Sequence, residues 1–302
     1  MILDLIPLWA ILGIAAALVS TAIPLFQEKN KANPLALAII VKTVSAIVIL
    51  PVVLHQGLPA NLNFYLAVSL TSLLWAISDV IYYRAVTQSG AGVVSRLLPS
   101  AVVFSFILWF FFDPSLLDRY LANPVQAALI VSIIALSAFF AMQIRKCPVS
   151  WKGFRLVWFV IFAACTGPLL EKMTLGQAPL AQAPYAFVFV QSCFMLGFWL
   201  IFLLIRKPIK LSTLTSYLSL KTGLVIGLCS ALAVTLRFMG LQEADHPAYL
   251  SILLFTDALW IVLYHKMIGR EDGSNIKAGL GIVFCAVALV VIKSPILEGL
   301  FW

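Results

Sequence analysis

The sequence predicts an all-α integral membrane protein with ten transmembrane helices, arranged as two inverted five-helix repeats. Three observations predict this class: the composition, ten long apolar runs, and a shared order of motifs in the two halves. The 302 residues are 63% hydrophobic and 11% charged. Soluble domains are about 45–50% apolar and about 25% charged, so the excess of apolar side chains has to face lipid.

Each apolar run is long enough for one helical crossing. A crossing needs about 20 apolar residues, because a helix rises about 1.5 Å per residue through a hydrocarbon core about 30 Å thick. Uninterrupted apolar segments favour helices over barrel strands, which would alternate polar and apolar side chains. The expected spans are residues 5–26, 33–54, 62–84, 90–112, 122–144, 152–172, 184–205, 222–241, 247–266 and 275–293.

The two halves of the chain have similar motifs in the same order. We divide the chain into a repeat of residues 1–147 and a repeat of residues 148–302. Each repeat has a proline late in its first span, Pro24 or Pro168, and opens its second span with another proline. Because each half has an odd number of spans, the halves insert with opposite orientation. Secondary transporters built this way bind substrate at the repeat interface.

Basic residues predict the orientation in the membrane. The loops after odd-numbered spans hold thirteen of them: Lys29, Lys31, Arg84, Arg145, Lys146, Lys152, Arg155, Arg206, Lys207, Lys210, Lys266, Arg270 and Lys277. The other side holds three: Arg119, Lys172 and Lys293. The positive-inside rule therefore predicts cytoplasmic odd-numbered loops and outside termini in the cell (inner) membrane. Because this charge is spread over short loops, the net charge of +8 does not indicate nucleic-acid binding.

Ionisable residues inside spans cost roughly 2.5–3.5 kcal/mol each and usually face a cavity or a partner. The second, third, fourth, eighth and ninth spans carry such residues. We therefore expect a polar cavity among these spans, with contributions from the first, sixth and seventh. The fifth and tenth spans have none in their interiors and are expected at the periphery.

Lys42 and Asp257 are expected at the centre of this cavity, since both lie nine residues from the same boundary, about 13 Å deep. We predict that they bind opposite charges of a polar or zwitterionic substrate. The alternative is a structural ion pair between the halves. Trp260 and Tyr83 are predicted to line the cavity, and Gln191, deep in the seventh span, is predicted to contact substrate.

Two further pairs of charges are candidates for gating or proton coupling. Asp79 and Arg96 share a hairpin and a depth, so they either lock that hairpin as a salt bridge or form a gate. Glu171 and Arg237 fall near the opposite mouth. Extension of each side chain to the interface is the simplest expectation, and gating or proton coupling is the alternative.

Three stretches resemble a known family. They are Tyr82-Tyr83-Arg84-Ala85-Val86 through Val93-Val94-Ser95-Arg96-Leu97-Leu98-Pro99, Asn33-Pro34-Leu35 followed by Lys42, and Gly269-Arg270-Glu271-Asp272 before the last span. They resemble the drug/metabolite transporter (DMT) superfamily, in its EamA-type branch. The resemblance implies a ten-helix inverted repeat with a central cavity that moves amino acids, other metabolites, nucleotide sugars or lipid-linked sugars. One feature departs from it, because most members keep both termini in the cytoplasm.

We therefore expect a secondary transporter that moves a small polar metabolite, such as an amino-acid-like solute, by alternating access. A flippase for a lipid-linked sugar or a nucleotide-sugar carrier of the same fold is the alternative. The sequence has no HExxH, GxSxG or P-loop motif and no metal-type cysteine spacing, so we expect no enzyme activity, no cofactor and no metal. The expected partners are a small-molecule substrate and the bilayer, with the chain a monomer or homodimer.

Overall fold

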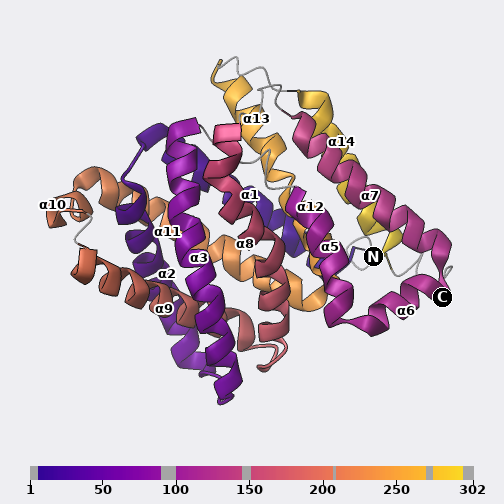
Figure 1. Cartoon of the computed structure of the whole chain (residues 1–302), viewed down its shortest axis with the longest axis horizontal. Coiled ribbons are helices and arrows are strands. Elements are labelled where there is room, and N and C mark those ends of the chain that lie inside the picture. The colour runs from indigo at the N-terminus through magenta and orange to yellow at the C-terminus, as the bar shows by residue number, and fades with distance from the viewer. Residues whose placement is uncertain (1–5, 90–99, 145–150, 207–208, 270–274, 295–302) are drawn as a thin grey trace.

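The computed structural model of this chain describes residues 6–89, 100–144, 151–206, 209–269 and 275–294, and these residues are almost entirely helical (Figure 1). The helices are α1 (Leu8–Asn30), α2 (Pro34–Gln56), α3 (Leu62–Ser89), α5 (Ser100–Phe112), α6 (Pro114–Ala122), α7 (Pro124–Gln143), α8 (Trp151–Leu175), α9 (Ala183–Arg206), α10 (Leu211–Leu214), α11 (Tyr217–Glu243), α12 (Pro247–Leu254), α13 (Asp257–Met267) and α14 (Ile276–Ile292).

The chain is a multi-pass helical membrane protein. Within the described residues, eight helical segments are long and apolar enough to cross a membrane, and α12 and α13 together form one of them. A ninth is added if α5 and α6, which meet at a bend of 104°, form one span, and α14 is a shorter apolar helix. The fourth expected span, 90–112, is described only from residue 100 onward. The count of ten spans therefore stays a prediction.

Polar residues set where several helices begin. The Asn33 side chain accepts hydrogen bonds from the backbone N–H groups of Leu35 and Ala36, both at 3.1 Å. Asp113, Asn123, Ser216 and Asn275 cap α6, α7, α11 and α14 in the same way. Such caps satisfy N–H groups that have no partner within the first turn of a helix.

The expected span 247–266 is broken near its middle. The hydroxyl of Thr256 donates to the carbonyl of Leu253 at 2.7 Å, and the Thr256 backbone N–H reaches the same carbonyl. Bonds three residues apart tighten the chain into a 3₁₀-like turn, which separates α12 from α13. Asp257 therefore occupies the first turn of a new helix.

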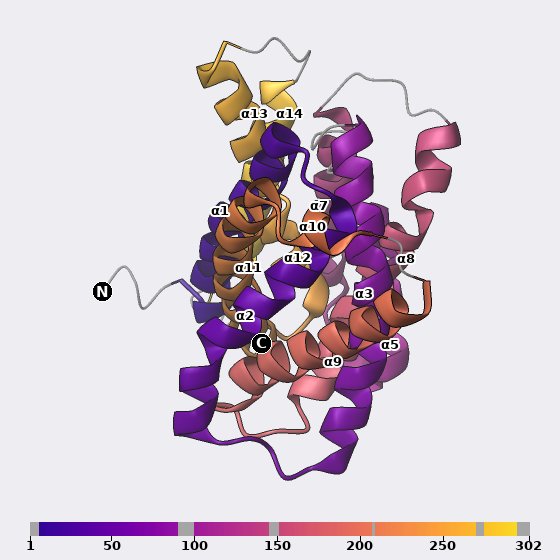
Figure 2. The ribbon, with the colours of Figure 1, turned by 90° about the vertical axis from the view of Figure 1, so that its left-hand side faces the viewer.

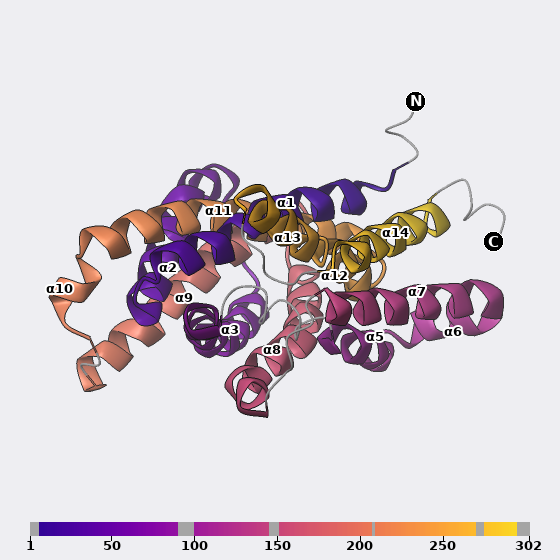
Figure 3. The same cartoon turned by 90° about the horizontal axis from the view of Figure 1, so that it is seen from above.

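The helices pack in a bundle that is longer than it is thick (Figures 1 and 3). Helices α7 and α14 pack against each other at one edge, and α2, α9 and α11 gather at the opposite edge, with α3 and α8 in contact between them. Figure 2 shows α13 and α14 together at one end of the bundle. Helix α1 packs along α11.

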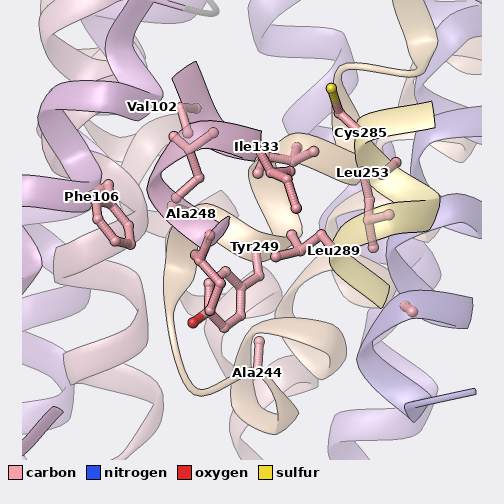
Figure 4. Packing of buried hydrophobic residues seen from close by; sticks show 14 of the residues in the cluster. Val102, Phe106, Ile133, Ala244, Ala248, Tyr249, Leu253, Cys285 and Leu289 are labelled. Carbon is pink, nitrogen blue, oxygen red and sulfur yellow. The ribbon is translucent and has the colours of Figure 1, made fainter. Parts of the chain in front are cut away.

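A buried apolar cluster joins α5, α7, α12 and α14 (Figure 4). Tyr249 of α12 is completely buried in it, beside Phe106 of α5 and Leu289 of α14. The hydroxyl groups of Tyr120 and Tyr249 also share a hydrogen bond. This cluster anchors the first segment of the broken span, so that the break itself faces the interior of the bundle.

The sequence did not predict helices α6 and α10. Residues 113–121 were expected as a loop, although Asp113 followed by Pro114 is a strong helix-start signal. Helix α10 has only four residues and lies in the loop between α9 and α11. Helix α10 is too short to cross a membrane, and α6 reaches the length of a span only together with α5.

Candidate functional site

A polar cavity of about 240 Å³, here called the central cavity, lies where α1, α2, α3, α8, α9, α11 and α13 meet. Its lining residues are Ser20, Ile23, Lys42, Trp75, Ser78, Asp79, Tyr82, Tyr83, Val160, Ala164, Glu171, Gln191, Ser230, Val234, Arg237 and Asp257. Of the described residues of α7 and α14, none lines it, as the charge distribution along the sequence predicts.

A second cavity of about 210 Å³, the adjoining cavity, shares part of this wall. The shared residues are Trp75, Tyr82, Ala164, Arg237 and Asp257. The rest of its wall is mostly apolar and comes from α1, α5, α8, α12 and α13. The two cavities together offer a charged compartment beside an apolar one.

Lys42 of α2 forms an ion pair with Asp79 of α3. The distance from Lys42 Nζ to Asp79 Oδ2 is 3.4 Å, and both side chains are largely buried. This contact joins two helices of the first half and so differs from the expected structural pair between Lys42 and Asp257. The expected salt bridge between Asp79 and Arg96 stays a prediction, because Arg96 lies outside the described residues. The positive charge of Lys42 is therefore compensated within the first half.

Glu171 of α8 forms the second ion pair, with Arg237 of α11. The carboxylate also accepts a hydrogen bond of 2.8 Å from the indole N–H of Trp75. The Arg237 guanidinium lies 5.7 Å from the centre of the Trp75 ring, within the range of a cation–π contact. The expectation that Glu171 and Arg237 extend to the membrane surface is wrong. Glu171 is only 1% exposed, because its two partners satisfy the carboxylate inside the bundle.

Asp257 faces the central cavity, and the described residues place no compensating charge beside it. Among the described residues, no cation lies within ion-pairing distance of its carboxyl group, and the backbone N–H of Ala258 is its nearby donor. The break between α12 and α13 places this carboxyl at a helix N-terminus, where the helix dipole favours a negative charge. Asp257 also lines the adjoining cavity, so it stands at the boundary between the polar and apolar compartments.

Gln191 and Tyr83 are buried side chains that also line the central cavity. Gln191 is 4% exposed, and its Nε2 has no hydrogen-bond partner among the described residues. An unsatisfied buried amide is costly, at about 1–3 kcal/mol, unless a water or ligand supplies the missing acceptor. Gln191 is therefore poised to donate a hydrogen bond into the cavity.

The structure thus brings most of the predicted site residues together. The residues that share the central cavity are Lys42, Asp79, Tyr83, Glu171, Gln191, Arg237 and Asp257. Trp260 lines neither cavity; Ile261, four residues after Asp257, faces the adjoining cavity instead. Trp260 and Asp257 lie in the same helix, where three residues turn the chain by about 300° and four by about 400°, so Ile261 lies nearer than Trp260 to the face of Asp257.

Sequence reasoning missed three serines of the cavity, Ser20, Ser78 and Ser230. Serine is common inside membrane helices, where its hydroxyl can bond to the preceding turn, so no sequence signal separates cavity serines from others. Ser20 illustrates this, because its Oγ donates to the carbonyl of Ala17 at 2.9 Å.

Glu28 and His265 form a third buried contact, outside the central cavity. The distance from His265 Nε2 to Glu28 Oε2 is 3.2 Å, and the contact joins the ends of α1 and α13. Both residues line a separate pocket with Lys29 and Tyr264. This contact ties the second segment of the broken span to α1.

Comparisons with known proteins show similarity in fold. No family model matches the sequence, and no curated protein matches it. A solved structure titled "Crystal structure of protein" is similar, with a TM-score of 0.66 and 12% sequence identity. The match covers 94% of this chain and 97% of that chain. The two chains therefore share a fold over nearly their whole length.

Proposed function

We propose that this chain is a secondary transporter that moves a small polar metabolite by alternating access, as a member of the EamA-type branch of the drug/metabolite transporter superfamily. The central cavity is the observation that carries the proposal. Within an apolar bundle, the described residues bring five acidic or basic side chains to it from α2, α3, α8, α11 and α13: Lys42, Asp79, Glu171, Arg237 and Asp257. Placing charged side chains in the membrane interior costs free energy, so their presence there marks a pathway for a polar solute.

The helix contacts support an inverted repeat. Suppose that α1, α2, α3, α5 and α7 correspond in order to α8, α9, α11, α12 and α14. Each contact between two helices should then recur between their two counterparts. Helix α1 packs on α11, and its counterpart α8 packs on α3. Helix α1 also packs on α12, and α8 packs on α5. The contacts α2–α9 and α7–α14 each join a helix to its own counterpart.

The two prolines predicted as equivalents support the same arrangement. Pro24 and Pro168 both line the adjoining cavity. A helical proline cannot donate to the carbonyl four residues earlier, and those residues, Ser20 and Ala164, both line the central cavity. Broken or weakened helices around a central site are typical of alternating-access transporters.

The site residues take two roles in this proposal. Asp257, Lys42, Gln191 and Tyr83 contact the substrate. The pairs Lys42–Asp79 and Glu171–Arg237 join helices that would move relative to each other, so Asp79, Glu171 and Arg237 serve in gating or proton coupling. Because the sequence has no nucleotide-binding motif, transport is facilitated, exchange-driven or ion-coupled.

Flux into proteoliposomes tests the function directly. The purified chain is reconstituted, and uptake is measured for amino acids, organic cations, organic anions and a fluorescent lipid-linked sugar. Saturable uptake of a small solute, reduced by Asp257→Ala and by Lys42→Ala with folded yield unchanged, supports the proposal. Movement of the lipid-linked sugar alone supports the flippase instead, and solute uptake unaffected by both substitutions removes the binding role of these residues.

A further inference from the structure

We infer that the solute bound in the central cavity is an organic cation, an amine whose positive nitrogen pairs with Asp257. This inference rests on the proposed transport function and specifies its substrate class. It differs from the zwitterion expected from the sequence. The difference comes from the pairing of charges, which the sequence alone did not reveal.

The charge of the described cavity is negative. Lys42 is compensated by Asp79, and Arg237 is compensated by Glu171. Two cations and three carboxylates leave a formal charge of −1 when Asp257 is ionised. The unbalanced group is Asp257, so the charge complement of this cavity is a single cation.

A zwitterion or an anion fits this arrangement poorly. Its carboxylate would need a free cation, and both cations of the described cavity already have carboxylate partners. Taking Lys42 away from Asp79 would leave a buried carboxylate without compensation, which is strongly unfavourable. The pairing of charged side chains in the cavity therefore disfavours a negative group on the ligand, and the Asp257 carboxylate attracts a positive one.

Several acceptors surround the position of the cation. An ammonium group has up to three N–H donors. The Asp257 carboxylate can accept one, and the carbonyls of Ser20 and Ala164, which Pro24 and Pro168 cannot engage, are candidates for the others. The sites offered to a ligand are thus mainly acceptors.

Gln191 supplies the independent second contact. Its side chain is 4% exposed and lines the same cavity, and its Nε2 lacks an acceptor among the described residues. A carbonyl or hydroxyl oxygen on the ligand would satisfy it. The aromatic rings of Trp75 and Tyr82 line both cavities and offer faces for an apolar or aromatic body. The ligand class is an amine with an apolar body and one hydrogen-bond acceptor.

Proton competition follows from this chemistry. If Asp257 begins protonated, binding of R–NH₃⁺ to its carboxylate releases one H⁺, and no other bond changes. The titratable and charged groups that face Asp257 across the cavity are Lys42 from α2, Asp79, Tyr82 and Tyr83 from α3, Glu171 from α8, and Arg237 from α11. Helices α1 and α14 pack on α13, but none of their described titratable groups lines the cavity. Glu28 of α1 contacts His265, which lies two turns after Asp257 in α13.

A matched panel of three small molecules tests the inference. Tyramine, 3-(4-hydroxyphenyl)propionate and tyrosine share a phenol group and carry a cation, an anion and a zwitterion. Binding to purified protein in detergent is measured by calorimetry at several pH values for the wild type, Asp257→Asn and Gln191→Leu. Asp118→Asn, on the exposed surface of α6, is the matched control for loss of a carboxylate.

We expect tyramine to bind at least tenfold more tightly than the other two. Asp257→Asn should weaken tyramine binding at least tenfold, Gln191→Leu should weaken it severalfold, and Asp118→Asn should leave it unchanged. In the acidic range the dissociation constant of the wild type should rise with falling pH, and Asp257→Asn should remove this dependence. A circular-dichroism melt checks that each variant is folded.

Preference for tyrosine or the propionate, or tyramine binding that Asp257→Asn does not change, overturns the inference, as does binding of no panel member. Flux measurements separate this from the transport proposal. Uptake of a zwitterion or anion in proteoliposomes would leave the transporter intact while overturning the cation class. Tyramine binding without flux of any solute would uphold the cation site while overturning transport.

Discussion

The indole ring of Trp75 occupies the space in which residue 167 of α8 would otherwise carry a side chain. A Cβ on Gly167 would lie 2.5 Å from Trp75 Cζ2, closer than any real contact. This close approach brings the indole N–H to Glu171, one turn farther along α8. Gly167 therefore positions the network that holds Glu171 and Arg237 in the cavity.

Gly167→Ala should destabilise the protein by about 3 kcal/mol. The added methyl group displaces a large ring, at a typical overpacking cost of about 1–3 kcal/mol. It also weakens a hydrogen bond to a charged group, worth about 1.5–3 kcal/mol. Thermal melting in detergent measures the change, which should be accompanied by altered tryptophan fluorescence.

Gly197→Ala is the matched control, because a Cβ on Gly197 of α9 meets no atom within 4 Å. Replacing a helical glycine by alanine where space is free should stabilise by about 0.5–1 kcal/mol. If both variants melt alike, the close approach of Trp75 to α8 does not matter for stability.

The Lys42–Asp79 pair should show strong thermodynamic coupling. Lys42→Ala and Asp79→Ala should each cost about 3 kcal/mol, because each leaves one buried charge without its partner. The double variant should cost less than the sum by at least about 2 kcal/mol, since it removes both charges. Additive losses in a double-mutant cycle of melting temperatures would mean that the pair makes no net contribution.

Asp79→Asn should change which solutes bind. Removing this carboxylate frees Lys42 while Asp257 stays ionised, so separate positive and negative charges then face one cavity. We expect tyrosine to gain affinity relative to tyramine by about tenfold, which corresponds to about 1.4 kcal/mol. Calorimetry on the folded fraction measures the ratio, and an unchanged ratio would show that Lys42 does not reach ligand.

The sequence predicted the class of the fold and most of the cavity, for identifiable reasons. Charges in apolar spans are so costly that Lys42, Asp79 and Asp257 can be assigned to a shared interior from their positions along the chain. Their partners could not be assigned, because depth along a helix does not give rotation about it. The Lys42–Asp79 pair was therefore not predicted, and the predicted partner of Asp79, Arg96, lies outside the described residues.

The break before Asp257 was the second limit of prediction. It contains neither proline nor glycine, the usual signals of a broken helix, and depends on a threonine hydroxyl whose effect is weak in sequence statistics. Trp260 was predicted to line the cavity because it lies near the face of Asp257 in the same helix, but the structure places it in the wall of neither cavity. By contrast, Pro24 and Pro168 were predicted as equivalents, because proline constrains the backbone in any context, and both line the adjoining cavity.

His246 should make stability depend on pH. It is completely buried at the start of α12, where Nδ1 accepts from the Ala248 N–H at 3.0 Å and Nε2 lies 3.2 Å from the Phe106 carbonyl. Burial lowers the pKa of His246 from 6.5 to about 3. The folded state therefore binds fewer protons than the unfolded state, so stability is full above pH 6.5 and is lost as the pH falls toward 3.

Between pH 7 and pH 5 this one group should cost about 2 kcal/mol of stability, at up to about 1.4 kcal/mol per pH unit. His246→Asn keeps a capping side chain but cannot titrate, so its melting temperature should fall less over the same interval. His55→Asn, at an exposed position of α2, is the control and should follow the wild type. Equal pH dependence in all three proteins would show that His246 protonates without penalty.

The membrane orientation can be decided by labelling two loop positions. Leu180, between α8 and α9, is 69% exposed, and Leu211, in α10, is 74% exposed. They lie in loops on opposite sides of the predicted membrane.

In a background without the five natural cysteines, Leu180→Cys and Leu211→Cys each provide one thiol. The distribution of basic residues predicts that Leu180→Cys reacts with an impermeant maleimide on intact cells, and that Leu211→Cys reacts only after the membrane is opened. The reverse pattern would place both termini in the cytoplasm, as in most EamA-type proteins, and would mean that the positive loop charges do not set the orientation of this chain.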